Sequence, residues 1–174
     1  MNGVSENNPM KGIVVDKVTL NIGVGVAGQE LENAKELLET LSGAKAVPTH
    51  AKVRNPVFRI KKGDIIGTKA TLRGPTAIEF VKKALKVKQF SLPARSFDKE
   101  GNFSFGVPEY IEFPGAKYDP KIGMLGFDVC VTLRRRGYRV AKRRRARGRI
   151  GHTHRLKHDD GIEFAKGIFG IKVE

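Results

Sequence analysis

The chain has 174 residues, of which 40% are hydrophobic and 29% charged, and its formal net charge is +15. These values are typical of a single folded domain, and they exclude both disorder along the whole chain and two complete catalytic domains. The single cysteine, Cys130, excludes an internal disulfide and a cysteine-based zinc finger, and no apolar run approaches the roughly 20 residues that cross a bilayer. We therefore predict a cytoplasmic protein without a membrane partner.

The first half of the chain predicts a strand, a helix and then two more strands. Residues 13–22 alternate with a period of two, which indicates a strand with one buried face. The side chains predicted on that face are Val14, Val18, Leu20 and Ile22. Residues 29–41 have helical spacing, with Gly43 as the C-terminal cap. Residues 51–60 predict a strand or hairpin turning at Asn55-Pro56, and 65–73 predict a strand with Thr71 on its polar face.

The second half predicts one more helix, several strands and a short terminal helix. Thr76 and Glu79 resemble a capping box for a helix reaching about Lys86. Short strands are expected at 103–105 and 110–113, a longer one at 125–134 and a terminal one at 168–173. Asp160 with Glu163 predicts the start of the last helix.

This order of elements predicts an α+β fold: a two-layer antiparallel sheet with helices packed on one face, an RRM-like or ferredoxin-like arrangement with extra strands. We expect a flexible polar tail at residues 1–10, an α+β RNA-binding domain at 11–133, and a basic C-terminal extension at 134–174 packed on the same domain. The uncovered sheet face would present polar side chains to RNA.

The excess positive charge lies in two stretches. Residues 134–149 hold ten basic and no acidic residues, and residues 45–73 hold eight basic residues and one acid. So many positive charges close together repel one another, and this concentration of charge predicts a polyanionic partner. Nine of the ten cations in 134–149 are arginines, which favour RNA or DNA because guanidinium groups bind phosphate in a bidentate manner and stack on bases. A solvated tail, a targeting signal or an anionic membrane surface is the alternative.

Gly23, Gly25 and Gly28 spell G-x-G-x-x-G between a predicted strand and a predicted helix, as in a dinucleotide site, and so raise the alternative of a nucleotide-dependent enzyme. That site also needs an acid about 20 residues further on, but none occurs between Glu39 and Asp64. We interpret the glycines as a tight turn whose backbone can approach a phosphate closely.

No other motif indicates catalysis or a cofactor. The spacing of His152, His154 and His158 matches no standard zinc site, and neighbouring cations would repel a metal. Two aromatic residues besides Phe58 sit among cations, namely Tyr110 and Tyr138. These three rings could stack on bases, and core packing is the alternative.

Four segments resemble the large-subunit ribosomal protein five family. They are LNIGVG at 20–25, RNPVFRIKKGDIIGTKATLRG at 54–74, RSFDKEGNFSFGVPEYIEFPGAKYDP at 95–120 and GMLGFDV at 123–129. The similarity runs from about Lys11 to Val131, and RRRARGRIGHTHRLKH after it resembles the archaeal and eukaryotic branch.

The resemblance implies a ribosomal protein that binds 5S rRNA and helps attach it to the large subunit in the central protuberance. It further implies contacts with large-subunit rRNA, with P-site tRNA through a loop at about 51–61, and with small-subunit ribosomal protein thirteen across an intersubunit bridge. It implies no enzymatic activity, no cofactor, no metal and no obligate homo-oligomer.

By matching motif, Asn21, Phe58 and Thr71 fall on family positions for 5S rRNA, whereas Ala44 replaces a usual glutamine and inherits no role. The full set expected at 5S rRNA is Asn21, Gly23, Gly25, Phe58, Lys69, Thr71 and Arg73. The expected tRNA-facing residues are Lys52, Arg54, Asn55, Arg59 and Lys61. The expected rRNA phosphate contacts are Arg134, Arg135, Arg136, Arg139, Arg143, Arg144, Arg145, Arg147 and Arg149.

Overall fold

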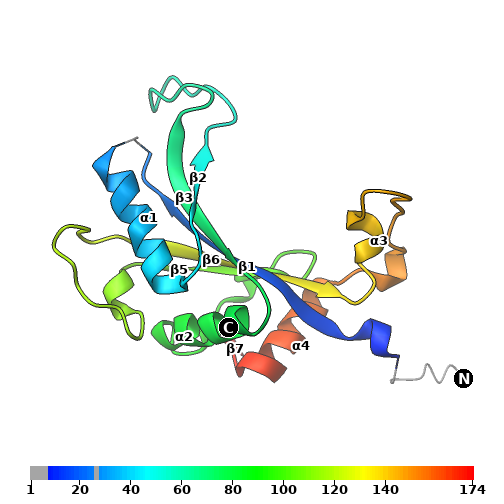
Figure 1. Ribbon diagram of the computed structural model, residues 1–174. Coiled ribbons are helices and arrows are strands. Elements are labelled where there is room, and N and C mark those ends of the chain that lie inside the picture. The colour runs from blue at the N-terminus through cyan, green and yellow to red at the C-terminus, as the bar shows by residue number, and fades with distance from the viewer. Residues whose placement is uncertain (1–7, 26–27) are drawn as a thin grey trace, which may run out of the picture.

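A five-stranded antiparallel sheet forms the centre of the computed structural model, which describes residues 8–25 and 28–174 (Figure 1). The strand order is β2-β3-β1-β6-β5. The bounds are β1 Ile13–Gly23, β2 Val47–His50, β3 Ile65–Leu72, β5 Phe103–Val107 and β6 Phe127–Arg135. Two short parallel strands, β4 Ser91–Leu92 and β7 Lys172–Val173, form a separate pair.

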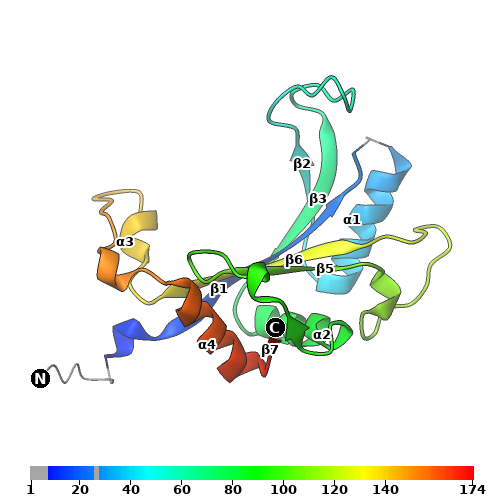
Figure 2. The same cartoon turned by 180° about the vertical axis from the view of Figure 1, so that it is seen from behind.

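Two long helices, α1 Gln29–Ser42 and α2 Pro75–Val87, cover one face of the sheet (Figures 1 and 2). The C-terminal part adds α3 Arg139–Lys142 and α4 His158–Phe169. Short 3-10 turns occupy Pro9–Lys11, Ala94–Ser96, Tyr110–Glu112 and His152–His154. No helix in the described ranges is long and apolar enough to span a membrane.

The chain order β1-α1-β2-β3-α2-β6 with strand order β2-β3-β1-β6 is the split βαβ arrangement of ferredoxin-like folds. β5 extends that sheet beyond β6. The predicted α+β class, with an antiparallel sheet, helices on one face and extra strands, is therefore confirmed.

The core lies between the sheet and the two long helices. Val18, Leu20 and Ile22 of β1 are buried there, as the alternation predicted. A β-bulge between Val15 and Lys17 shifts the phase of the first half of β1, so that Ile13 and Val15 pack against the core. The prediction for Val14 is wrong because one inserted residue turns every earlier side chain to the opposite face.

Several predicted element bounds are wrong. No strand occupies 51–60, where the only ladder contact is an isolated bridge between Asn55 and Ile60, and 110–112 is a 3-10 turn rather than a strand. α2 begins at Pro75 without a side-chain cap, so Thr76 does not form the predicted capping box. α4 extends from His158 through Phe169, which shortens the predicted terminal strand to β7.

The C-terminal residues share the core of the sheet domain. Leu156, Ala165, Phe169 and Ile171 belong to the same buried apolar cluster as the strands, and β7 pairs with β4. At the other end, the first seven residues of the expected flexible tail lie outside the described residues, as do 26–27. Asn8 caps the 3-10 turn at Pro9–Lys11.

Candidate nucleic-acid interface

The sheet face opposite α1 and α2 carries polar side chains in rows across the strands. One row aligns Lys69 of β3, Asn21 of β1, Asp128 of β6 and Gly106 of β5. The next row aligns Thr71, Thr19, Cys130 and Ser104. Directly paired residues point to the same side of a sheet, with Cβ atoms about 5 Å apart. Asn21 and Thr71 therefore lie in neighbouring rows of one surface, which we call the polar sheet face.

Most of the predicted 5S-binding residues come together on this polar sheet face. Lys69 lies beside Asn21, Gly23 ends β1, and Arg73 follows β3 and is exposed. Thr19 lies on the polar face of β1 that its alternation with buried residues predicts, whereas Ser104 of β5 was not among the residues expected on this surface. Its alternation with buried residues was the available signal, but only the strand register shows which strands lie side by side.

Cys130 and Asp128 lie in the middle of this surface. Burial raises the pKa of the Cys130 thiol, and the negative charge of Asp128 raises that pKa further. The thiol is therefore neutral at physiological pH and adds no negative charge to the polar sheet face.

The glycine-rich turn after β1 is tied to β3. The backbone N–H groups of Val24 and Gly25 both donate to the carbonyl oxygen of Ile66, at 3.0 and 2.8 Å. Gly25 has a φ of +83°, in the left-handed region that favours glycine. Because these two amides are already paired, they are not free to cradle a cofactor phosphate.

The loop 51–64 between β2 and β3 projects beyond the sheet (Figures 1 and 2). Asn55 and Ile60 exchange two backbone hydrogen bonds, and the side-chain oxygen of Asn55 accepts a third from the N–H of Val57. These bonds close the tip of the loop, which exposes Phe58 by 70% and Val57 by 84%. Phe58 thus lies on the projecting loop, apart from the strands that carry Asn21 and Thr71.

Cations surround this apolar loop tip. The exposed basic residues of the loop are Lys52, Arg54, Arg59, Lys61 and Lys62. A loop that combines exposed apolar side chains with cations can contact both the bases and the phosphates of an RNA. Of the predicted tRNA-facing residues, Asn55 differs because its side-chain oxygen is used within the turn.

The arginine-rich segment, residues 134–149, is partly neutralised by carboxylates of its own chain. Asp16 binds both Arg134, at 2.8 Å, and Lys142, and Asp160 binds Arg135 at 2.9 Å. The side chain of Arg135 is only 14% exposed. Arg134 and Arg135 therefore hold the segment in place, and they are less available to phosphates than their sequence neighbours.

Two further arginines fold the arginine-rich segment into a compact shape. The Nε–H of Arg143 donates to the carbonyl oxygen of Ala146, and that of Arg147 to the carbonyl oxygen of Ala141. These bonds leave the outer guanidinium nitrogens free to bind phosphate. The other predicted phosphate contacts are exposed, and these are Arg136, Arg139, Arg144, Arg145 and Arg149.

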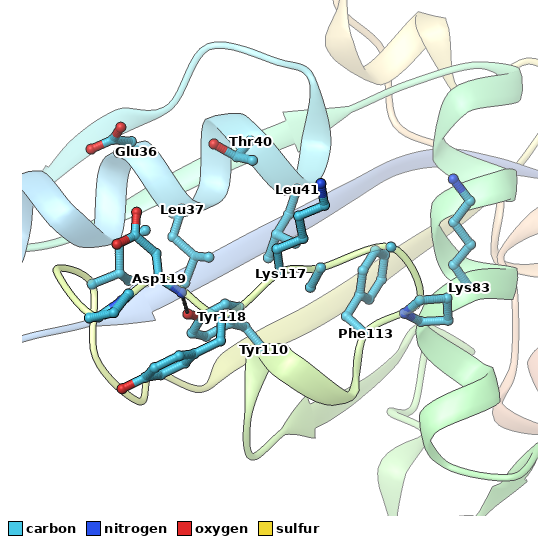
Figure 3. Close-up of a pocket in the computed structure, with 15 residues that line it drawn as sticks. Glu36, Leu37, Thr40, Leu41, Lys83, Tyr110, Phe113, Lys117, Tyr118 and Asp119 are labelled. Atoms are coloured by element: carbon cyan, nitrogen blue, oxygen red, sulfur yellow. Dashed lines mark hydrogen bonds between the residues drawn. The ribbon is translucent and has the colours of Figure 1, made fainter.

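Tyr110 is a core residue rather than a surface for stacking. Only 1% of it is exposed, and its hydroxyl accepts a hydrogen bond from the N–H of Asp119 at 3.0 Å (Figure 3). It supports a cavity of about 510 Å³ between α1 and the loop after β5. Of the two alternatives left open for Tyr110, core packing is therefore the correct one, and stacking on bases is excluded.

The hydroxyl of Tyr138 is also used within the fold, in hydrogen bonds to the backbone. It accepts from the N–H of Leu156 at 2.9 Å and donates to the carbonyl oxygen of His154. Nε2 of His154 lies 2.8 Å from the carbonyl oxygen of Arg136. Across residues 8–25 and 28–174, no three His, Cys, Asp or Glu side chains are grouped so that they could hold a metal ion.

Comparisons with known proteins show which family this chain is similar to. The family model described as "Ribosomal protein L5" matches residues 8–61, and the model for the C-terminus of the same ribosomal family matches residues 65–164. Large ribosomal subunit protein uL5 of Archaeoglobus fulgidus is 47% identical over 96% of this chain and 93% of its own. The uL5 of Methanococcus vannielii is 49% identical over 98% and 96%, and that of Sulfolobus acidocaldarius is 43% identical over 99% and 97%. The chain therefore belongs to the ribosomal protein L5 family.

Proposed function

We infer that the chain is a structural constituent of the large ribosomal subunit, acts in the cytoplasm within the ribosome and is not an enzyme. The archaeal relatives carry the name of a large-subunit protein and align over nearly the whole chain. Two separate basic surfaces on one small domain suit a protein that bridges large RNAs.

Within the subunit, the polar sheet face binds 5S rRNA and helps attach it in the central protuberance. The observation that carries this proposal is the register that places Asn21 and Thr71 in neighbouring rows, beside Lys69. Side-chain amides and hydroxyls on an open sheet can form hydrogen bonds with phosphates and 2′-hydroxyls, and no polar atom of the core loses its partner when they do. Gly23 supports the proposal because a Cβ there would meet no atom within 4 Å, so RNA can approach the backbone.

The projecting loop 51–64 contacts P-site tRNA, and the arginine-rich segment contacts large-subunit rRNA. Exposed guanidinium groups such as those of Arg144 and Arg145 support the second contact, because they bind phosphate in a bidentate manner. The exposed Phe58 and its neighbouring cations support the first. The contact with small-subunit ribosomal protein thirteen rests on the family resemblance alone.

Substitution of Thr71 by valine tests the 5S rRNA site. Thr71→Val removes one hydroxyl from the polar sheet face and keeps the β-branched shape that suits a strand. Loss of one hydrogen bond to RNA corresponds to about a fivefold to tenfold weaker affinity. Asn21→Ala is expected to act in the same direction. Binding is measured by titration of 5S rRNA, with circular dichroism to verify the fold.

The matched control is Thr40→Val, because Thr40 is exposed on α1, on the other side of the sheet. It should bind 5S rRNA like the parent. If Thr71→Val and Asn21→Ala both bind 5S rRNA as tightly as the parent does, the sheet face is not the 5S site.

A further inference from the structure

A second cavity, of about 630 Å³, lies between the arginine-rich segment, the chain that follows it and the turn at residues 98–102. Its position is distinct from the polar sheet face. The permanently charged groups that line it are Lys99, Arg147, Arg149, Arg155 and Lys157, with Glu100 as the single carboxylate. An electrostatic environment of this kind favours an anionic ligand.

The remaining lining is largely apolar. Leu133 and Leu156 are buried, and Ala141, Ile150 and the ring of Tyr138 line the same part of the cavity. The imidazole of His152 also lines the cavity. The Tyr138 hydroxyl is bonded to backbone groups, so the ring offers carbon atoms rather than a free polar group. The cavity therefore joins an apolar interior to a cationic rim.

Hydrogen bonds fix the wall formed by residues 98–102. The Asp98 carboxylate accepts from the backbone N–H groups of Glu100 and Asn102, at 2.9 and 2.7 Å. The side-chain oxygen of Asn102 in turn accepts from the N–H of Leu133 on β6. This wall is anchored to the central sheet and holds Lys99 at the rim.

The opposite walls are fixed in the same way. Arg147 donates from Nε to the carbonyl oxygen of Ala141 at 2.6 Å. The backbone N–H of Gly148 donates to the carbonyl oxygen of Val140 at 3.1 Å. The Asp160 carboxylate accepts from the N–H of Lys157 at 3.0 Å. Hydrogen bonds within the chain therefore hold these walls, and such preorganisation lowers the entropic cost of binding.

We propose that this cavity binds a single nucleotide, with its base against Tyr138, Ile150 and Leu156 and its phosphate at the arginine rim. The volume falls within the range of about 300–1,000 Å³ typical of small-molecule sites. A nucleotide matches both halves of the cavity, because its base is flat and its phosphate carries negative charge. This assignment rests on the proposed RNA-binding function, and an unpaired residue extruded from rRNA or a free nucleotide could supply the same chemistry.

The test compares the affinity of the full chain for two RNA duplexes that differ only in one bulged nucleotide, with each of the four bases in turn. The protein should bind the best bulged duplex about tenfold more tightly than the paired one, since stacking of one extruded base has this order of effect. Free AMP and GMP are added as competitors. If AMP or GMP at millimolar concentration displaces the bulged duplex, the cavity also binds free nucleotides. If the protein prefers the bulged duplex but neither nucleotide displaces it, the cavity binds only nucleotides within RNA.

Ile150→Trp should occupy the position proposed for the base and abolish the bulge preference while the affinity for the paired duplex is retained. Its control is Ile168→Trp, because Ile168 is exposed on α4 and does not line the cavity. Arg149→Gln is the second variant and should lower the affinity for the bulged duplex more than that for the paired one. Arg144→Gln removes the same charge from outside the cavity and should weaken both duplexes equally.

Equal binding of bulged and paired RNA by the parent, or a bulge preference that survives in both Ile150→Trp and Arg149→Gln, would overturn the proposal. Competition by an acidic peptide of alternating Glu and Leu, without bulge preference, would assign the cavity to a protein partner instead. Failure of the 5S proposal is distinguishable, because Thr71→Val alters the sheet face and leaves the bulge preference unchanged.

Discussion

Asp16 shows how a single carboxylate can hold a highly charged segment in place. It occupies the β-bulge of β1, where the extra residue turns its side chain toward Arg134 and Lys142. Partial burial by itself would raise the pKa of Asp16, but the hydrogen bond from Lys142 and the charges of Lys142, Arg134 and Lys17 outweigh burial and lower the pKa. The carboxylate therefore stays ionised and offsets part of the repulsion among the arginines.

Asp16→Asn should reduce the free energy of unfolding by about 1 kcal/mol at pH 7, because a charge-assisted contact is lost. A lowered folded-state pKa contributes stability above the unfolded value of about 3.9, and this stability is lost as the pH falls through the folded-state pKa. The difference between parent and variant should therefore disappear in acid. Urea unfolding at pH 7 and at about pH 2 to 3 measures it.

Glu163→Gln is the matched control, since Glu163 is exposed on α4 and the same carboxylate-to-amide change should alter stability little. A difference between Asp16→Asn and the parent that stays constant down to low pH would contradict an electrostatic role for Asp16.

At the scale of elements, α4 approaches the rest of the molecule most closely at a contact between two glycines. A Cβ built on Gly161 would lie 2.3 Å from the carbonyl oxygen of Gly101 and 2.5 Å from its Cα. This close approach brings the first turn of α4 against the turn at 98–102. Asp160, which directly precedes Gly161, forms the ion pair with Arg135. Only glycine at 161 allows this approach.

Gly161→Ala should destabilise the protein by about 2 kcal/mol, because the methyl group meets backbone that cannot move aside as a side chain can. Gly167→Ala, on the same helix, is the control. Its Cβ would meet no atom within 4 Å, so it should stabilise the helix by up to about 1 kcal/mol. Thermal unfolding of both variants tests the contact, and equal effects of the two substitutions would show that it is unimportant.

At the scale of the whole molecule, the two basic surfaces lie at opposite ends of β1. Gly23 pairs with Gly67, close to the projecting loop, whereas Ile13 pairs with Arg135 at the start of the arginine-rich segment. Eleven residues of strand separate these ends by about 35 Å, well beyond the Debye length of about 8 Å at physiological salt. The two basic surfaces therefore repel each other only weakly, and we expect each to act independently of the other.

Replacement of Arg143, Arg144 and Arg145 by glutamine should lower the salt dependence of binding to large-subunit rRNA. If six to ten phosphates are neutralised by the parent, its affinity should fall about 10³-fold to 10⁵-fold between 50 and 200 mM salt. Removing three phosphate contacts should reduce the slope of log affinity against log salt by about 2 to 3. Titrations across this salt range measure the slope.

The control replaces Lys82, Lys83 and Lys86 by glutamine. These residues are exposed on α2, away from the arginine-rich segment, and their loss changes the net charge by the same amount. An equal reduction of the slope in both triple variants would mean that net charge alone, and not the arginine surface, controls binding.

Local patterns were sufficient to predict much of the fold and to identify the polar and basic surfaces that make up the candidate site. The alternation at Val18, Leu20 and Ile22 identified the buried face of β1, because a period of two is a property of neighbouring residues. The same alternation placed Thr71 on the outer face of β3. The concentration of arginines in 134–149 identified that basic surface without any knowledge of tertiary structure.

Contacts between distant residues could not be predicted in this way. Asp16 and Lys142 are 126 positions apart, and the bulge that joins them depends on the register of β1 with β6. The sequence also left open that Tyr110 is in the core, since only packing decides whether an aromatic ring is covered.

The amino-acid sequence by itself determined the secondary-structure periodicity, the family resemblance and the two concentrations of charge, because each depends on the order of residues alone. The tertiary structure decided which arginines bind carboxylates of the same chain and which are exposed. It also formed the cavity between Lys99 and Arg149, which are far apart in the chain. Both outcomes depend on how the elements pack, because pairing and enclosure are properties of positions in space.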